Sequence, residues 1–278
     1  MTIELRNVVL LVRKEVVEAR RNRWVLLYAT VFAVLSLALS WMGLAGLSGY
    51  GLSGFGRTAA SMINLVMLTV PLMGLTLGAT SLAGERERGT LLFMASQPLT
   101  RFEVLAGKFI GMAVALLGAL VVGFGLSGVV IAYYGGTTSV GQYVGLLGLT
   151  FILAMATLGI GMAVASLTQR TDTAIGVALF TWLVLVVIGD LGIIGGSLLA
   201  DVGISRMFAL VLINPLQVFK LAAILTIRGS LDVLGPVGVY ATRAHGGSLL
   251  ALLVAVSMVW VVAGFCVSYG VFRRKGAV

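Results

Sequence analysis

Hydrophobic and polar residues are segregated along this chain into long blocks. Stretches of about 20 or more residues with at most one charged side chain alternate with short polar stretches. An α-helix rises 1.5 Å per residue, so about 20 apolar residues cross the roughly 30 Å hydrocarbon core of a bilayer. The pattern predicts six transmembrane helices, over residues 24–44, 61–83, 109–133, 143–167, 174–199 and 248–271.

Residues 1–23 follow a helical rather than a uniformly apolar pattern. Apolar residues recur at intervals of three and four from Leu5 to Ala19, and charged residues occupy the remaining faces. We expect an amphipathic helix that lies in the membrane interface. A cleavable signal peptide would reach a short apolar core sooner and would end at small residues. A helix that docks on a soluble protein is the alternative, and one helix can do both.

The segment 201–247 is too interrupted to be a simple span. Asn214 and Pro215 break its apolar stretch, so neither half is long enough to cross the bilayer. Counting both halves as one broken span would give seven spans and would place the two chain ends on opposite sides. We therefore expect amphipathic or re-entrant helices on the extracytoplasmic side. The candidate contacts for a periplasmic partner are Phe208, Leu212, Asn214 and Pro215.

The overall composition indicates the same class of protein. Hydrophobic residues make up 59% of the chain and charged residues 10%, against roughly 25% charged in soluble domains. Cys266 and His245 are single residues of their types, so the sequence offers no internal disulfide and no His or Cys metal site. A G-x-x-x-x-G-K-[ST] phosphate loop is not found in the sequence, so we do not expect this chain to hydrolyse ATP. The predicted fold is an all-α polytopic membrane protein with one transmembrane domain over residues 24–278.

Basic residues are unevenly divided between the two sides of the predicted spans. Of the 19 Lys and Arg residues, 14 fall on the side of the N-terminus and five on the other. Basic residues are enriched in cytoplasmic loops, so we place both termini in the cytoplasm. This topology also accounts for the net charge of +9, which in a soluble protein would suggest nucleic-acid binding. We expect no nucleic-acid partner.

The densest cluster of charge lies between the second and third predicted spans. Residues 84–108 contain seven of the 29 charged side chains, whereas residues 109–169 contain none. The segment combines a charged run, a turn, an apolar patch, a proline and the charged start of a further helix: Glu85, Arg86, Glu87, Arg88, Gly89, Thr90, Leu91, Leu92, Phe93, Pro98, Arg101 and Glu103. Thr100 and Glu103 have the spacing of a capping box. We expect two short helices that display apolar residues beside charges, as a docking surface does. A loop whose charges only set the topology is the alternative.

This stretch resembles a known motif. E-R-E-x-G-T-L at 85–91, followed by Q-P-L-T-R-x-x-V-x-x-G-K-F-x-G at 97–111, is similar to the first cytoplasmic loop of ABC-2 type permeases, the membrane subunits of ATP-driven exporters. In that family the loop carries a coupling helix, which sits in a groove of a separate ATPase subunit. The resemblance implies ATPase coupling for residues 84–108 and a homodimer in the bacterial inner membrane. It also implies two cytoplasmic ATPase subunits that bind ATP and magnesium, with no cofactor, metal or catalytic residue in this chain.

One branch of that family is similar over nearly the whole length. The opening R-K-E-x-x-x-A-R-R-N-R-W from Arg13 to Trp24 and the segment around Asn214 resemble permeases of the systems that mature nitrous oxide reductase in denitrifying bacteria. Those systems include a periplasmic β-helical protein and support assembly of the enzyme's copper–sulfur centre, so the resemblance implies the same partner and role. The alternatives are an ABC-2 exporter of a drug, lipid or natural product, a secondary transporter, and a non-transporting assembly protein. No residue identifies the transported species.

Overall fold

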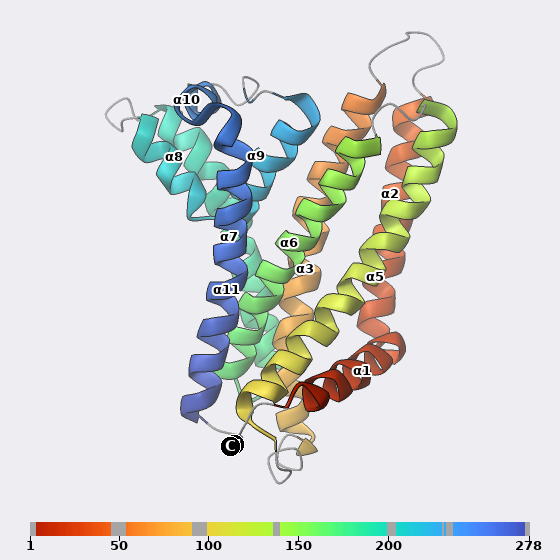
Figure 1. Ribbon diagram of the computed structural model, residues 1–278, viewed down its shortest axis with the longest axis vertical. Helices are drawn as coiled ribbons and strands as arrows, with labels where there is room; N and C mark the ends of the chain where they lie inside the picture. Colours follow the sequence, from red (N-terminus) through yellow and green to blue (C-terminus); the bar gives the residue numbers. More distant parts are fainter. Residues whose placement is uncertain are drawn as a thin grey trace.

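The computed structural model describes residues 4–45, 54–90, 99–135, 140–198, 204–229, 231 and 236–275, and all of its regular secondary structure in these ranges is helical. The helices are α1 (Leu5–Arg21), α2 (Arg23–Ala45), α3 (Gly54–Glu87), α5 (Arg101–Gly135), α6 (Val140–Leu167), α7 (Thr171–Leu198), α8 (Ile204–Leu212), α9 (Pro215–Arg228), α10 (Pro236–His245), the 3-10 turn η2 (Gly246–Ser248) and α11 (Leu249–Lys275) (Figure 1). The predicted all-α class is confirmed.

Six of the described helical segments are long and apolar enough to cross a membrane. They are Arg23–Gly43, Ala59–Glu87, Arg101–Tyr133, Val140–Leu167, Thr171–Gly189 and Val237–Arg274. The number of these candidate segments equals the predicted number of spans. In hydrocarbon every backbone N–H and C=O must be bonded within the protein, which is why each long apolar run forms a continuous helix.

The charged end of the second span is part of its helix. α3 continues to Glu87, and Gly89 then adopts a φ of 71°. This left-handed conformation suits glycine because it has no Cβ. The predicted break at Gly89 and Thr90 therefore marks the end of α3.

The capping box at Thr100 and Glu103 is present, but it opens the third span itself. The backbone N of Thr100 donates to Glu103 Oε2 at 2.6 Å, and the backbone N of Glu103 donates to Thr100 Oγ1 at 3.2 Å. α5 then runs without a break from Arg101 to Gly135. The prediction of a separate short helix before residue 109 is wrong, because the polar first turns of α5 continue the same helix that crosses the bilayer.

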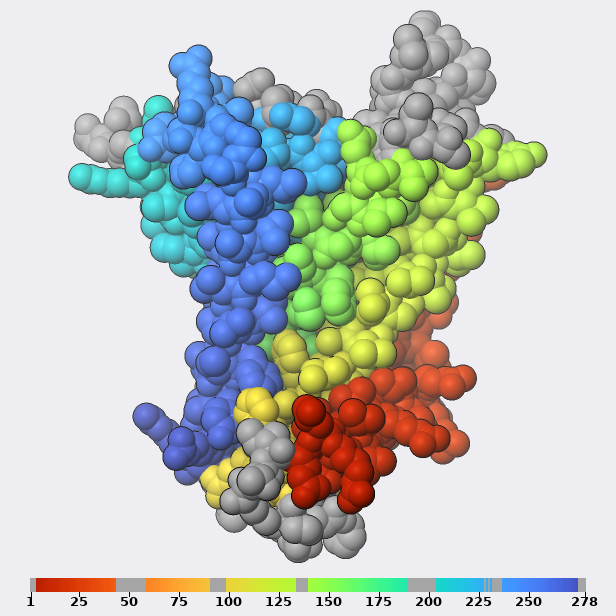
Figure 2. Space-filling model, in the orientation of Figure 1, coloured from red at the N-terminus to blue at the C-terminus, as the bar shows by residue number. Residues whose placement is uncertain are grey.

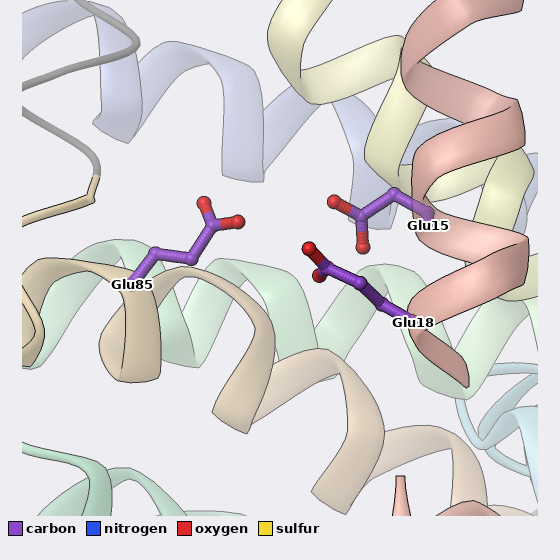
Figure 3. Close-up of side chains that lie close together, drawn as sticks. All are labelled: Glu15, Glu18 and Glu85. Carbon is purple, nitrogen blue, oxygen red and sulfur yellow. The ribbon is translucent and has the colours of Figure 1, made fainter. Parts of the chain in front are cut away.

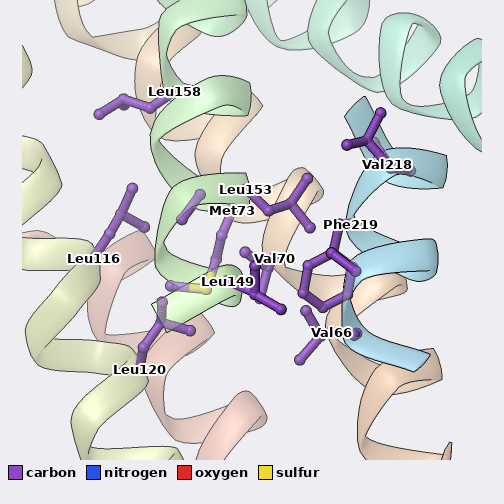
Figure 4. Packing of buried hydrophobic residues seen from close by; sticks show 14 of the residues in the cluster. Val66, Val70, Met73, Leu116, Leu120, Leu149, Leu153, Leu158, Val218 and Phe219 are labelled. Atoms are coloured by element: carbon purple, nitrogen blue, oxygen red, sulfur yellow. The ribbon is translucent and has the colours of Figure 1, made fainter. Parts of the chain in front are cut away.

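α8 and α9 form a bent pair at the opposite end of the bundle from α1 (Figure 1). Their axes differ by 106° across the break before Pro215, so they make a seventh span only if the pair is counted as one broken helix. α9 enters the bundle. Leu216 and Phe219 are almost fully buried, and Figure 4 shows Phe219 beside Val66 and Val70 of α3. The predicted break at Asn214 and Pro215 is confirmed, and the helix that follows it packs inside the bundle.

α3 and α6 pack closely in the centre of the molecule. An ideal Cβ placed on Gly78 would lie 2.5 Å from the carbonyl oxygen of Leu158, and one on Gly161 would lie 2.4 Å from that of Leu75. Small residues allow this close approach. The resulting van der Waals contact stabilises the helix pair in a membrane, where lipid is as apolar as the helices and the hydrophobic effect does not favour their association. Leucine, valine and methionine side chains from α3, α5, α6 and α9 fill the space around the contact (Figure 4).

The two ends of the bundle are built differently. Figure 1 places α1, the end of α3, the start of α5 and the end of α11 together at one end, which we call the α1 end, and α8, α9 and α10 at the other. α1 lies across the bundle and packs on α5. In the space-filling view it forms part of the outer surface (Figure 2). The beginning and the end of the described chain therefore lie at the same end of the bundle.

Candidate functional site

The α1 end contains a buried ion-pair cluster that joins three helices. Nζ of Lys108 in α5 lies 2.8 Å from Glu15 Oε1 in α1 and 2.7 Å from Glu85 Oε1 in α3. The exposed fractions are 1% for Lys108, 7% for Glu15 and 5% for Glu85. Burying a charge is costly unless it is paired, so each of these groups requires the others. One ammonium group thus holds α1, α3 and α5 together.

Lys14 and Glu18 complete the cluster at its more exposed edge. Lys14 Nζ lies 3.1 Å from Glu85 Oε1 and 3.5 Å from Glu18 Oε1. Partial burial lowers the pKa of Lys14, but the carboxylates of Glu85 and Glu15 outweigh burial and raise this pKa above its usual value. Lys14 therefore remains protonated at neutral pH.

The carboxylates of Glu15, Glu18 and Glu85 converge (Figure 3), and one oxygen of each lies within 4.8 Å of the others. Three carboxylates at this spacing would suit a divalent cation. Lys14 and Lys108, however, already lie at the oxygens that such an ion would bind. With two positive and three negative groups, the five side chains suit an ion-pair network better than a metal site.

Three consecutive residues at the end of α3 contact three different sets of neighbours. Glu85 faces α1 and α5 in the cluster. Arg86 Nη1 donates to the carbonyl oxygen of Thr168 at 2.5 Å, just past the C-terminus of α6. Glu87 Oε2 accepts from the backbone N of Thr171 at 3.1 Å, at the N-terminus of α7. A cation near a helix C-terminus and an anion at an N-terminus both interact favourably with the helix dipoles. The E-R-E run thus ties the end of α3 to four helices.

A second set of bonds fixes the start of α1 to the start of α5. Glu103 Oε1 accepts from the backbone N of Glu4 at 2.8 Å and from Asn7 Nδ2 at 3.3 Å. Its other oxygen remains in the capping box with Thr100. One buried carboxylate thus caps α5 and holds the first turn of α1.

Two glycines of α5 bring α1 close enough for these bonds to form. An ideal Cβ on Gly107 would lie 2.5 Å from the Cβ of Leu11, and one on Gly111 would lie 2.5 Å from the Cβ of Glu15. The G-x-x-x-G spacing places both glycines on one face of the helix. This face receives α1, and the close packing lets Glu15 reach Lys108.

A cavity of about 1100 Å³ lies beside the cluster, between α1, α2, α3, α5 and α7. Charged and apolar side chains share its wall, among them Glu18, Arg88, Trp24 and Ile175. The cavity is therefore a recess with a mixed charged and apolar lining at the α1 end.

The other residues predicted to couple the chain to an ATPase surround this site. Arg88 Nε donates to the carbonyl oxygen of Gly84 at 3.0 Å, and Thr90 Oγ1 donates to that of Glu85 at 3.2 Å, so both fold back on the end of α3. Arg101 donates to the carbonyl oxygen of Arg273 and joins α5 to α11. The remaining predicted residues lie outside the described ranges: Leu91, Leu92, Phe93 and Pro98.

The four residues predicted to contact a periplasmic partner all make contacts within this chain. Phe208 is 6% exposed, and its ring centroid lies 6.3 Å from that of Tyr240 in α10. Asn214 caps α9 by accepting from the backbone N of Leu216 at 3.0 Å, and its amide donates to the carbonyl oxygen of Leu185 in α7 at 2.6 Å. Pro215 is the first residue of α9, where a missing N–H costs nothing. The carbonyl oxygen of Leu212 accepts from the indole of Trp260 at 3.4 Å. These four residues hold the bent pair in place, and their contact with a partner stays a prediction.

Sequence reasoning did not identify Glu15 and Lys108 as a pair. A signal was present, because Glu15 interrupts the apolar face of α1 and Lys108 is the last charge before 61 uncharged residues. Ionisable residues in such apolar surroundings require a partner. Which partner each one finds depends on how α1 lies against α5, and this is not encoded in the spacing.

Comparison with known proteins agrees with this architecture. The sequence model of the ABC-2 family transporter protein matches residues 9–277. The chain is 28% identical over 270 residues to the "Probable ABC transporter permease protein NosY" of Stutzerimonas stutzeri and 29% identical over 270 residues to the protein of the same description from Pseudomonas aeruginosa. Each alignment covers 95% of this chain and 96% of the relative. This chain, with its six candidate spans, therefore belongs to the ABC-2 family of transporter proteins, as a membrane-embedded permease subunit that relies on partner subunits for ATP hydrolysis.

Proposed function

We propose that the α1 end is the cytoplasmic face of the permease and that an ATPase subunit docks on the connection between α3 and α5. The elements at this end carry 14 of the 19 basic residues, and the positive-inside rule supports a cytoplasmic location for them. Both termini are then cytoplasmic, and α8, α9 and α10 lie on the periplasmic side of a bacterial inner membrane.

The observation that carries the proposal is the set of bonds made by Glu85, Arg86 and Glu87. They join the end of α3 to α1 and α5, to the end of α6, and to the start of α7. A force on the docked connection is therefore passed to several spans at once instead of being absorbed by a free loop. ATP binding and hydrolysis on the partner would move the connection, and these bonds would transmit the movement into the bundle.

We infer further that two copies of this chain act with two ATPase subunits, and that the complex serves the maturation of nitrous oxide reductase. The similarity to the NosY proteins over 95% of the chain supports this role. A periplasmic β-helical protein would receive the movement at the α8–α10 side, where the copper–sulfur centre of the enzyme is assembled. Substrate export, or mechanical work on that partner, is the step that ATP drives.

The proposal is tested in cells that depend on this permease for active nitrous oxide reductase. We expect Phe93→Ala to release the ATPase from the purified complex, because removal of an aromatic anchor costs about 2 kcal/mol or more, roughly a 30-fold loss of affinity. Glu87→Ala should leave the ATPase attached but lower the amount of copper–sulfur centre, which is measured by the visible absorption of the purified reductase. The Glu87→Ala substitution removes the hydrogen bond from the backbone N of Thr171 at the start of α7, and it leaves the connection on which the ATPase would dock unchanged.

Asp172→Ala is the matched control for Glu87→Ala, because it removes an acidic side chain from the first turn of α7 without removing the link to α3. A Glu87→Ala variant with a full complement of copper–sulfur centre would contradict transmission through the E-R-E run. Normal ATPase retention in Phe93→Ala would contradict docking on this connection.

A further inference from the structure

We propose that α1 binds anionic lipid headgroups through a row of arginines on its outer face. Arg6, Arg13 and Arg20 recur every seven residues, with Leu10 and Val17 between them. Seven residues are close to two turns of an α-helix, so these five side chains form one row along the helix. All five are exposed. The row lies on the side of α1 away from the face that packs on α5.

The acidic residues of α1 lie away from the outer row of arginines. Glu15 is buried in the ion-pair cluster, where Lys108 pairs with it, and Glu18 lies at the exposed edge of the cluster, where Lys14 pairs with it. The three arginines of the outer row form no ion pair with any of the described residues. The outward surface of α1 is therefore basic and uncompensated, and an anionic layer is the charge complement that it lacks.

The position of α1 identifies that layer as the membrane surface. One residue, Asn22, separates α1 from α2, whose crossing segment begins at Arg23. The short link holds α1 at the level where the first span enters the bilayer. Trp24 is 56% exposed at this level, as tryptophans at membrane interfaces commonly are.

A second row of apolar side chains runs beside the arginines. Leu5 is 80% exposed and Val9 64% exposed, and Val12 and Val16 continue the row at intervals of three and four residues. An interfacial helix buries such a row at the boundary between headgroups and acyl chains. Arginines adjacent to it then extend to the phosphates, which the guanidinium group can contact through two parallel hydrogen bonds.

The expected size of the effect follows from the number of arginines. Each basic side chain near an anionic leaflet contributes about a fivefold gain in binding, so three arginines give a preference on the order of 100-fold for anionic over zwitterionic lipid. The preference is a property of this chain alone and does not depend on the ATPase. It can therefore be measured separately from the proposed coupling function.

The test uses the full-length protein in detergent micelles, titrated with dioleoyl phosphatidylglycerol or with dioleoyl phosphatidylcholine. Native mass spectrometry counts the bound lipids at each concentration. In the variant R6Q/R13Q/R20Q we expect the preference for phosphatidylglycerol to fall at least tenfold. The matched control is R273Q/R274Q/K275Q, which removes three basic residues from the end of α11 at the same end of the bundle, and it should change the preference less than twofold. The variant R6K/R13K/R20K keeps the charges and should keep most of the preference.

Three results would overturn the proposal. The first is an unchanged preference in R6Q/R13Q/R20Q. The second is an equal loss in the α11 control, which would indicate general attraction to a basic face. The third is release of the ATPase from R6Q/R13Q/R20Q while phosphatidylglycerol binding is retained, which would assign the row to protein docking. An unaltered melting temperature in phosphatidylcholine shows that each variant is folded.

Discussion

At Lys108 one ammonium group is shared between carboxylates from two other helices. The side chain is almost completely buried, as are its partners Glu15 and Glu85. Removing one member of such a set leaves an uncompensated charge away from water, which costs more than the pair contributes when intact. Lys108 is therefore one of the residues of α5 on which the packing of α1 depends, together with Glu103, Gly107 and Gly111.

We expect Lys108→Met to destabilise the folded protein by about 3 to 5 kcal/mol, because Glu15 and Glu85 would face each other with only Lys14 to compensate. The measurement is the thermal unfolding of the purified protein in detergent. Lys14→Met should have a smaller effect, since Lys14 is partly exposed and its ion pairs are screened.

The variant K108M/E15Q/E85Q tests the cause of that loss. With both carboxylates neutral, no unpaired charge remains, and most of the stability should return. A triple variant that unfolds at the same temperature as Lys108→Met would show that the volume or hydrogen bonding of Lys108 matters rather than its charge.

The packing of α1 on α5 depends on where glycines and polar residues occur in the two helices. Gly107 and Gly111 admit Leu11 and Glu15 at distances that any Cβ would block. The bonds of Glu103 to the first turn of α1 then set the position of α1 along α5. The polar contacts between α1 and α5 form only when the two helices touch, so they depend on the close packing at the glycines.

We expect Gly111→Ala to separate α1 from α5 and to destabilise the protein by about 1 to 3 kcal/mol, the usual cost of overpacking. The added methyl would meet the Cβ of Glu15, so contact between Glu15 and Lys108 should weaken as well. Thermal unfolding in detergent measures the loss.

Gly118→Ala in the same helix is the control, because a Cβ there meets nothing within 4 Å. Alanine in a helix interior is favoured over glycine by roughly 0.5 to 1 kcal/mol, so this variant should be as stable as the parent or slightly more so. Equal melting temperatures for the two variants would contradict the close contact of α1 with α5.

At the scale of the whole molecule, the bundle separates a polar end from an end that carries the bent pair. α1, the end of α3, the start of α5 and the end of α11 gather at the first, and α8, α9 and α10 at the second (Figure 1). In Figure 1 α8 leads into the bundle and α9 leads back to the same end, as in a re-entrant pair. With the six candidate spans, such a pair would leave both chain ends on the same side of the membrane.

We expect a reporter that is active only in the cytoplasm to work when fused after Val278 and to fail when inserted at Ser53 or at Ser230. The expectation rests on 14 basic residues at the α1 end against five at the other. Enzymatic activity of the reporter in intact cells is the measurement, and immunoblotting controls for expression. Activity at Ser230 would mean that the bent pair crosses the membrane as a seventh span.

The sequence by itself determined the elements of this protein. Long uncharged runs can satisfy their backbone polar groups in a bilayer only as helices, so the number of spans could be read from composition alone. Local sequence patterns also predicted three structural details: the break at Gly89, the capping box at Thr100 and Glu103, and the break before Pro215. Each of them depends on residues only a few positions apart. The prediction missed that α5 begins at Arg101, before its apolar stretch. The residue at which a sequence becomes apolar need not be the residue at which the helix begins.

Only the tertiary structure decided which elements meet. Lys108 is 93 residues from Glu15 and its contact with that residue requires α1 to lie across α5 at the glycine face. The same is true of α9, whose buried side chains pack against α3, α6 and α11 in the folded bundle. Periodicity specifies which side of a helix is apolar, but lipid and protein are equally apolar neighbours. The choice between them is made by shape, by close packing at small residues and by the pairing of the few buried charges.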